Sequence, residues 1–344
     1  MTEHSSETLT PIGFTMGDPA GIGPEIIVRL LAKPQPWPCV VYGDPDWLQK
    51  TAKWLQLDCE IRTIDSPREL TQLSETSSHQ SKPAVIPVLK TSQVSDEVTL
   101  GQISAQAGAC AHACIEQAVK DALSGDIRAI VTAPLHKHAM ALAGVPFPGH
   151  TEMLAAYSGH VPVAMMLANP SLRVVLVTIH ESIRRVPDLI TFDKELQTIE
   201  FAHQAGQQLG FKSPRVAVAG LNPHAGEDGQ FGREEIEIIM PAIQKAQTLG
   251  INVSGPYPGD TIFARARQGE FDVVVAQYHD QGLIPVKYLG LDEGVNVTLG
   301  LPFVRTSVDH GTAFDIAAQG IASEASLYHA LVMADQLSQH RLNG

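Results

Sequence analysis

Short hydrophobic runs alternate with longer amphipathic stretches along most of this chain. The runs are rich in β-branched residues and about five residues long, as expected for strands buried on both faces. The stretches between them carry apolar side chains at helical spacing. Strands that alternate with helices predict an α/β fold with a mainly parallel sheet. The clearest runs centre near residues 14, 41, 130 and 297, and the clearest helical stretches are 102–124, 192–210, 233–249 and 324–340.

Three further runs each lead into a histidine. RVVLVTIH ends at His180, RVAVAGLNPH ends at His224, and FDVVVAQYH ends at His279. Ligands of open α/β sheets gather at the carboxyl ends of the strands, so three imidazoles could be delivered to one point there. Three protein ligands that leave one position open are typical of a catalytic zinc-type site. Each histidine alone could simply cap its strand or bond the backbone, but their shared placement favours a metal site.

Length and local composition indicate how the chain is divided. Its 344 residues exceed the size at which a single core stops growing, which predicts two subdomains. Residues 65–97 are rich in Ser, Thr, Gln and Pro, and we interpret them as loop or edge structure. The last helical stretch, 324–340, is expected to pack back onto the first subdomain.

Composition excludes several classes of protein. Hydrophobic residues make up 44% and charged residues 18% of the chain, which suits a soluble globular enzyme. A net charge of −13 argues against nucleic acid or an anionic membrane as partner. No run reaches the ~18–20 apolar residues of a membrane span, and the polar start lacks a signal-peptide pattern. Four cysteines without a CxxC pair suggest no disulfide framework, so we expect a cytoplasmic protein.

Two motifs in the first half of the chain carry candidate chemistry. In TMGDPAGIGPE, a glycine-rich turn precedes a helix that starts near Pro24, and this turn could bind an anion or be purely structural. It is neither a Rossmann fingerprint nor a P-loop. In TAPLHKHAMALAGVPFPGHTE, Lys137 and His150 are expected to contact an anion or substrate. Thr151 could do the same or could cap a helix.

Three motifs in the second half add charged groups. The glycine-rich loop after His224 brings Glu227 and Asp228, and Asp280 follows His279 directly, either as a partner that orients the imidazole or as a solvated acid. Arg305 can clamp a phosphate or carboxylate, and with Lys137 and Lys287 it predicts an anion pocket. Since no serine or cysteine has the context of a nucleophile, the chemistry is expected to use a metal as Lewis acid.

Seven short segments of the chain together resemble the 4-hydroxythreonine-4-phosphate dehydrogenase family of vitamin B6 synthesis. They occur in the family's order and cover the chain from about residue 11 to 320, and seven in order are far more specific than any one alone. The segments are TMGDPAGIGPE, TAPLHK, GHTE, GLNPHAGE with GREE, PYPGDT, YHDQG with PVK, and LPFVRTSVDHGTAFDIA.

The resemblance implies an activity and a set of site residues. The activity is NAD-dependent oxidation of 4-phosphooxy-L-threonine at C3, followed by decarboxylation to 3-amino-2-oxopropyl phosphate. NADP is an alternative cofactor. The implied metal ligands are the three strand-end histidines, and zinc, cobalt or magnesium are the implied ions, with nickel and manganese also possible. The implied substrate contacts are His150, Thr151, Lys287, Asn296 and Arg305.

The resemblance also implies an architecture like that of isocitrate and isopropylmalate dehydrogenases. Two α/β/α subdomains, 1–145 with 300–344 and 146–299, would flank an active-site cleft. NAD would bind without a Rossmann motif. The protein would be a homodimer whose interface completes the metal site, so that either subunit could supply each histidine.

Several alternatives stay open at the level of sequence. The general base could be Asp260, Asp280, Lys137 or water. The substrate could be a related phosphorylated hydroxy acid such as 4-phospho-D-threonate, because a paralogue would share nearly every motif. A metabolite-binding protein without activity, or a purely structural metal site, would also keep the fold.

Overall fold

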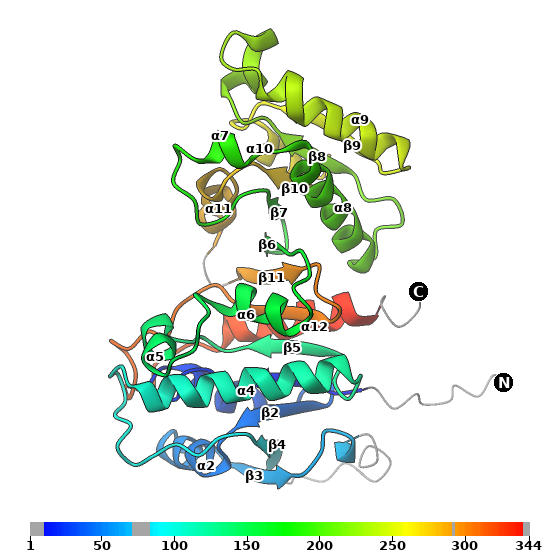
Figure 1. The fold of residues 1–344 in the computed structure, drawn as a ribbon. Helices are drawn as coiled ribbons and strands as arrows, with labels where there is room; N and C mark the ends of the chain where they lie inside the picture. Colours follow the sequence, from blue (N-terminus) through cyan, green and yellow to red (C-terminus); the bar gives the residue numbers. More distant parts are fainter. Residues whose placement is uncertain (1–9, 71–82, 291–292, 340–344) are drawn as a thin grey trace, which may run out of the picture. The chain divides into compact units, whose positions relative to one another are not determined.

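The computed structural model describes residues 10–70, 83–290 and 293–339 and divides into two compact units (Figure 1). Unit 1 combines Met1–Val161 with Leu301–Asp335, and unit 2 combines Pro162–Gly300 with Gln336–Gly344. The chain passes from unit 1 to unit 2 after Val161, where the expected boundary was residue 145. It returns to unit 1 after Gly300, where a boundary was expected. Unit 1 is therefore built from two distant segments of the chain.

Unit 1 holds a parallel sheet with the strand order β3-β4-β2-β1-β5-β12. The runs predicted near residues 14, 41 and 130 form its central strands, and their side chains are buried on both faces. The strands are β1 (Ile12–Thr15), β2 (Cys39–Gly43), β3 (Cys59–Ile64), β4 (Ala84–Lys90), β5 (Ala129–Thr132) and β12 (Val304–Val308). The helices are α1 (Gly23–Leu31), α2 (Pro45–Trp54), α4 (Ala105–Leu123), α5 (Lys137–Leu142), α6 (His150–Tyr157) and α12 (Ala325–Gln339).

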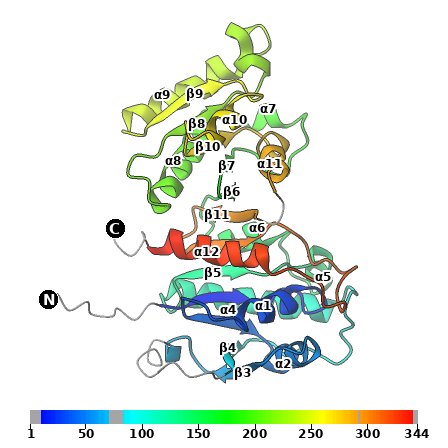
Figure 2. The ribbon, with the colours of Figure 1, turned by 180° about the vertical axis from the view of Figure 1, so that it is seen from behind.

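Helices cover both faces of this sheet. Figure 1 shows α4 across one face, and Figure 2 shows α1 and α12 on the other. The last helix is fixed to its sheet by a bond from Thr306 Oγ1 to the carbonyl of Ala330 and by a buried ion pair between Arg128 and Asp335, 2.7 Å apart. As predicted, this helix packs onto the first unit as far as Asp335, and its last residues, from Gln336 on, group with unit 2.

One correction concerns residues 65–97. They include an inner strand, β4, which pairs with β2 on one side and with the edge strand β3 on the other. Its sequence, AVIPVLK, contains a proline and follows a Ser- and Gln-rich stretch. Both features are typical of loops and edge strands, so the sequence did not predict an inner strand here. Part of the segment, 71–82, lies outside the described residues.

Unit 2 holds a mixed sheet with the strand order β11-β6-β7-β10-β8-β9. β6 is antiparallel to both of its neighbours, and β7, β10, β8 and β9 are parallel. The strands are β6 (Ala164–Ala168), β7 (Arg173–Leu176), β8 (Val216–Ala219), β9 (Val253–Tyr257), β10 (Val273–Ala276) and β11 (Val295–Leu299). The helical segments are α7 (Val186–Leu189), α8 (Phe192–Gln208), η1 (Pro223–Gly229), η2 (Glu235–Ile239), α9 (Met240–Thr248), α10 (Ile262–Arg267) and α11 (His279–Tyr288).

The helix predicted at 233–249 begins with a π-helical turn, η2, and continues as α9. Pro241 explains the change, because proline has no N–H to donate and its ring clashes with the carbonyl four residues earlier. On the side of α10 and α11, Ile262, Leu283 and Val286 pack into one apolar core with the strands. Both units thus have the mixed α/β, mostly parallel architecture that the alternation predicted.

No helix among the described residues is both long and apolar enough to cross a membrane. The four cysteines are free thiols, and Cys110 and Cys114 are buried on α4 as packing residues.

Candidate functional site

The three strands that lead to the histidines are neighbours in unit 2. β10 lies between β7 and β8 and is parallel to both, with Ala276 in register with Leu176 and Val275 with Val218. Their carboxyl ends therefore share one edge of the sheet. His180 and His224 follow β7 and β8 within a few residues, and His279 is the first residue of α11.

Two of the three imidazoles are close together. The ring centroids of His180 and His279 lie 5.6 Å apart. Nδ1 of His279 is 2.7 Å from Oδ1 of Asp280, a geometry in which the ring nitrogen donates and the carboxylate accepts. That bond leaves Nε2 of His279 for another ligand.

His224 is placed differently. Its ring packs near Phe231, with centroids 6.1 Å apart, and its side chain is exposed. Within the described residues, no three His, Cys, Asp or Glu side chains gather in a way that could hold a metal ion. The sequence suggested that the three imidazoles could meet at one point, and a single chain does not bring them together. The three-histidine metal site stays a prediction.

The loop that carries His224 has an unusual backbone. Residues 224–228 all have positive φ, and four of the five are not glycine. Such left-handed conformations cost about 1–2 kcal/mol per non-glycine residue, so surrounding bonds must hold them. Asn222 supplies them: its N–H donates to Glu235 Oε1 at 2.7 Å, and its Nδ2 donates to Glu234 at 2.7 Å. The loop is ordered, as the glycine-rich sequence predicted.

A cavity of about 690 Å³ lies beside this loop, entirely in unit 2. Asp260 and Asp280, two of the three residues proposed as general base, line it together with His224. Apolar side chains form part of its wall, and Tyr288 among them is 89% exposed. The cavity is thus lined by a histidine, two carboxylates and solvent-exposed apolar side chains.

Unit 1 contains a separate, electropositive group of residues. Arg305 on β12 is only 3% exposed, and its Nη2 donates to Thr132 Oγ1, at the end of β5, over 2.7 Å. Burial lowers the pKa of Arg305 to about 9. His150 is close enough that, after desolvation, the positive charges of Arg305 and Lys137 further hold its pKa well below 6.5. His150 is therefore neutral.

Helix α6 adds to this positive region. It begins at His150, and its N-cap is Gly149, which has no side chain to bond the first N–H groups. Thr151 is inside the helix and is not the cap, so the capping interpretation is wrong. The helix dipole favours negative charge at this end, where the carboxylate of Glu152 lies in the first turn. Nε2 of His150 is buried and has no hydrogen-bond partner among the described residues.

The remaining predicted contacts lie in unit 2. Lys287 is in the last turn of α11, and Asn296 is on β11, where its Nδ2 donates to Met165 Sδ at 3.2 Å. The five predicted substrate residues are thus divided, with His150, Thr151 and Arg305 in unit 1 and the other two in unit 2. Thr132, which ends a predicted strand, is a contact of Arg305 that no motif pointed to.

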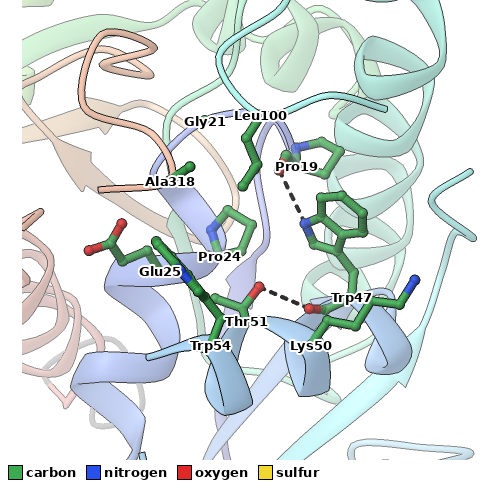
Figure 3. A pocket seen from close by; sticks show the side chains of 10 residues that line it. All are labelled: Pro19, Gly21, Pro24, Glu25, Trp47, Lys50, Thr51, Trp54, Leu100 and Ala318. Carbon is green, nitrogen blue, oxygen red and sulfur yellow. Dashed lines mark hydrogen bonds between the residues drawn. The ribbon is translucent and has the colours of Figure 1, made fainter. Parts of the chain in front are cut away.

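The glycine-rich motif TMGDPAGIGPE forms a turn whose glycines are explained by packing. A Cβ on Gly17, which has φ +73°, would lie 2.4 Å from the carbonyl oxygen of Pro134, and one on Gly23 would lie 2.5 Å from that of Met16. The turn borders a second, mostly apolar cavity of about 150 Å³ (Figure 3). There Trp47 Nε1 donates to the carbonyl of Pro19. These contacts favour the structural interpretation of the motif.

Comparison with known proteins identifies the family. The family model described as pyridoxal phosphate biosynthetic protein PdxA matches residues 35–334. This chain belongs to the PdxA family. As a PdxA-family dehydrogenase it is an oxidoreductase, and the family implies a nicotinamide cofactor. The resemblance inferred from the seven segments is confirmed.

PdxA-family relatives match nearly the whole chain. The 4-hydroxythreonine-4-phosphate dehydrogenase of Beijerinckia indica is 51% identical, over 95% of each chain. The D-threonate 4-phosphate dehydrogenase of Cupriavidus necator is 46% identical, over 98% of this chain and 99% of its own. The crystal structure of 4-hydroxythreonine-4-phosphate dehydrogenase from Klebsiella pneumoniae is 43% identical and covers 97% of this chain and 100% of its own, with a TM-score of 0.87.

Proposed function

We propose that this PdxA-family dehydrogenase oxidises 4-phosphooxy-L-threonine at C3 with NAD or NADP. The β-keto acid then loses carbon dioxide to give 3-amino-2-oxopropyl phosphate for pyridoxal 5'-phosphate biosynthesis. The observation that carries this proposal is the positive region of unit 1, where the buried Arg305 bonds Thr132 beside a neutral His150. A substrate with a phosphate and a carboxylate suits such a region.

The residues of unit 1 bind and orient the substrate. Arg305 presents a planar donor group to an anionic oxygen, and the open N-terminus of α6 presents backbone N–H groups. His150, being neutral, has a ring nitrogen that can donate to or accept from a substrate hydroxyl. When the phosphate and the carboxylate of a short substrate are both bound, the C3 hydrogen is held in one orientation toward the cofactor. This orientation lowers the entropic part of the barrier to hydride transfer. The nicotinamide, when bound, accepts the hydride.

Three imidazoles are a donor set that suits a divalent metal. His180 and His279 lie near each other at one sheet edge, and Asp280 fixes the ring of His279 with Nε2 left over. We propose these two with His224 as the ligands, supplied by one subunit or by both. Neutral imidazoles suit zinc or cobalt better than magnesium. When bound, the ion supplies a Lewis acid that stabilises negative charge on the substrate oxygen.

Asp260 is the general base that we favour. It lines the unit 2 cavity with His224, and its rival Asp280 already accepts a hydrogen bond from His279. Lys137 is instead placed on unit 1, at the start of α5. A carboxylate within reach of the substrate hydroxyl can remove its proton as the hydride leaves.

The proposal includes the quaternary arrangement that the family resemblance implies. Two α/β/α subdomains would flank a cleft, and a second copy would complete the site at a homodimer interface. Exposed apolar side chains near His224 support it: Phe231, Ile284 and Tyr288 are at least half exposed, as residues covered by a partner would be in a single chain.

A second substrate, 4-phospho-D-threonate, is favoured by the similarity to D-threonate 4-phosphate dehydrogenase of Cupriavidus necator. The two substrates share the phosphate, the carboxylate and the C3 hydroxyl. They differ at C2, which carries an ammonium group in the threonine and a hydroxyl in the threonate. The same residues would therefore bind most of either molecule.

Reduction of NAD by the purified protein tests the proposal. Each substrate is assayed alone, after chelation, and after zinc, cobalt or magnesium is added back. Turnover of the threonine that is lost on chelation and restored by metal supports the proposal, and preference for the threonate transfers it to the second substrate. His180→Ala should abolish turnover, whereas His329→Ala on α12 is the matched control. No NADH from either substrate would refute the assigned activity.

A further inference from the structure

The three strand ends that carry the histidines are joined by hydrogen bonds through one residue. Gln277 directly follows β10 and is fully buried. Its carbonyl accepts from Thr178 Oγ1 at 2.7 Å and from the Thr178 N–H at 3.2 Å. Thr178 is two residues before His180, and Gln277 is two residues before His279. The backbone that leads to one histidine is thus bonded to the backbone that leads to the other.

Gln281 adds a second connection, to the loop that follows β8. Its Oε1 accepts from the Gln277 N–H at 2.7 Å, and its Nε2 donates to the carbonyl of Gly220, also at 2.7 Å. Gly220 follows β8 and begins the loop to His224. A single amide side chain in the first turn of α11 therefore spans the turn before His279 and the loop before His224.

The surroundings leave this amide little freedom. A Cβ on Gly259 would lie 2.9 Å from Gln281 Nε2, so the glycine makes room for the side chain. Gln277 is held independently, because its Nε2 donates to the carbonyl of Ala219 at 2.9 Å and to Oε1 of the buried Glu195 at 3.1 Å. The Gly220 N–H in turn donates to the carbonyl of Tyr257 on β9 at 2.7 Å. The donor and the acceptor that bond the amide of Gln281 are thus each held by further hydrogen bonds.

We propose that Gln281 is a positioning residue of the histidine site, which sets the separation between the loops that carry His279 and His224, with Thr178 doing the same for His180. This inference rests on the metal site of the proposed function. Side chains that orient ligands without touching the ion commonly change metal affinity by about 10–100-fold when removed. Gln281 acts through the backbone, because both of its bonds are to main-chain groups.

Cobalt binding tests the proposal without any turnover. Co²⁺ is titrated into the purified full-length protein, and the visible d–d absorption reports the ligand geometry while the titration gives the Kd. Gln281→Met keeps the length of the side chain and removes both bonds. We expect its Kd for Co²⁺ to rise about 10–100-fold and its d–d spectrum to change. Thr178→Val should act in the same direction, whereas Thr178→Ser keeps the hydroxyl and should resemble the wild type.

A matched control separates positioning from general stability. Gln106 on α4 in unit 1 also donates its Nε2 to a backbone carbonyl, that of Gln93, at 2.8 Å. Gln106→Met removes a comparable bond far along the chain from the histidines and should leave cobalt affinity unchanged. If Gln281→Met shows wild-type affinity and spectrum while His180→Ala loses cobalt, the inference is wrong and the metal site stands. Absence of cobalt binding by the wild type would overturn both.

Discussion

His279 and Asp280, adjacent in sequence, are joined side chain to side chain over 2.7 Å. The carboxylate fixes which ring nitrogen carries the proton and makes the other a better metal ligand. We expect Asp280→Ala to weaken Co²⁺ or Zn²⁺ binding by about 10–100-fold. Isothermal titration with each metal measures this. Asp193→Ala, an exposed acid on α8, should leave affinity unchanged, and equal affinities for all three proteins would contradict the orienting role.

Arg305→Lys should impair substrate binding although the positive charge is kept. Lysine cannot present two parallel donors, and a lost charge-assisted hydrogen bond costs about 1.5–3 kcal/mol. We expect kcat/KM to fall about 10–100-fold, mainly through KM. Steady-state kinetics with varied substrate measures the effect, and circular dichroism checks the fold. An unchanged KM would mean that Arg305 does not bind the substrate anion.

His150 should stay neutral at a pH where ordinary histidines are half protonated. Desolvation first, and then the charges of Arg305 and Lys137, hold its pKa well below 6.5. In a nuclear magnetic resonance titration its ring signals should therefore keep their neutral positions at pH 6.5. Lys137→Met removes one of the two positive charges and should raise the pKa of His150. A pKa at or above 6.5 in the wild type would contradict the neutral donor that we assign.

The buried Glu195 should make stability depend on pH. Burial raises its pKa from 4.5 to about 7, so the folded protein keeps a proton that the unfolded chain releases. The stability from this group is complete below pH 4.5 and is lost as the pH rises through about 7, with a cost of about 3 kcal/mol at higher pH. Glutamine resembles the protonated acid, so Glu195→Gln should gain stability over the wild type at pH 8.5 and little at pH 5.

Urea unfolding at both pH values measures this difference. Glu200→Gln on the same helix is the control and should show no such gain. A wild type and a Glu195→Gln variant that change in parallel with pH would show that Glu195 is ionised in the folded protein.

The buried strands that could be predicted from the sequence are those made almost entirely of apolar, mostly β-branched residues. β1, β2 and β5 and the three strands before the histidines are short runs of β-branched residues, and the structure confirms them. Five strands were not predicted: β3, β4, β6, β9 and β12. A proline interrupts β4 and β9, and β6, with the sequence AMMLA, contains no β-branched residue. In β3 (CEIRTI) and β12 (VRTSV), charged or polar residues stand between the β-branched ones. Such strands are specified by their neighbours in the sheet more than by their own residues.

The site was predictable as a set of residues but not as an arrangement. The strand ends showed which histidines lie at one edge of the sheet. They could not show that residues 224–228 turn left-handed, because this depends on Asn222 reaching Glu234 and Glu235, twelve and thirteen positions away. The role of Gln281 could not be predicted either. Its two bonds go to backbone groups of Gln277 and Gly220, and every residue type has such groups, so the sequence does not show which ones a side chain will bond.

The split of unit 1 into two chain segments sets an order of events during synthesis. β12, which pairs with β5, and the helix that supplies Asp335 to Arg128 leave the ribosome after all the strands of unit 2. Unit 2, whose strands all lie within 162–300, has its complete sheet available earlier. Domains generally fold as units while the chain emerges. Residues 162–300 can therefore become native while one edge of β5 is still unpaired, before residues 304–335 have emerged.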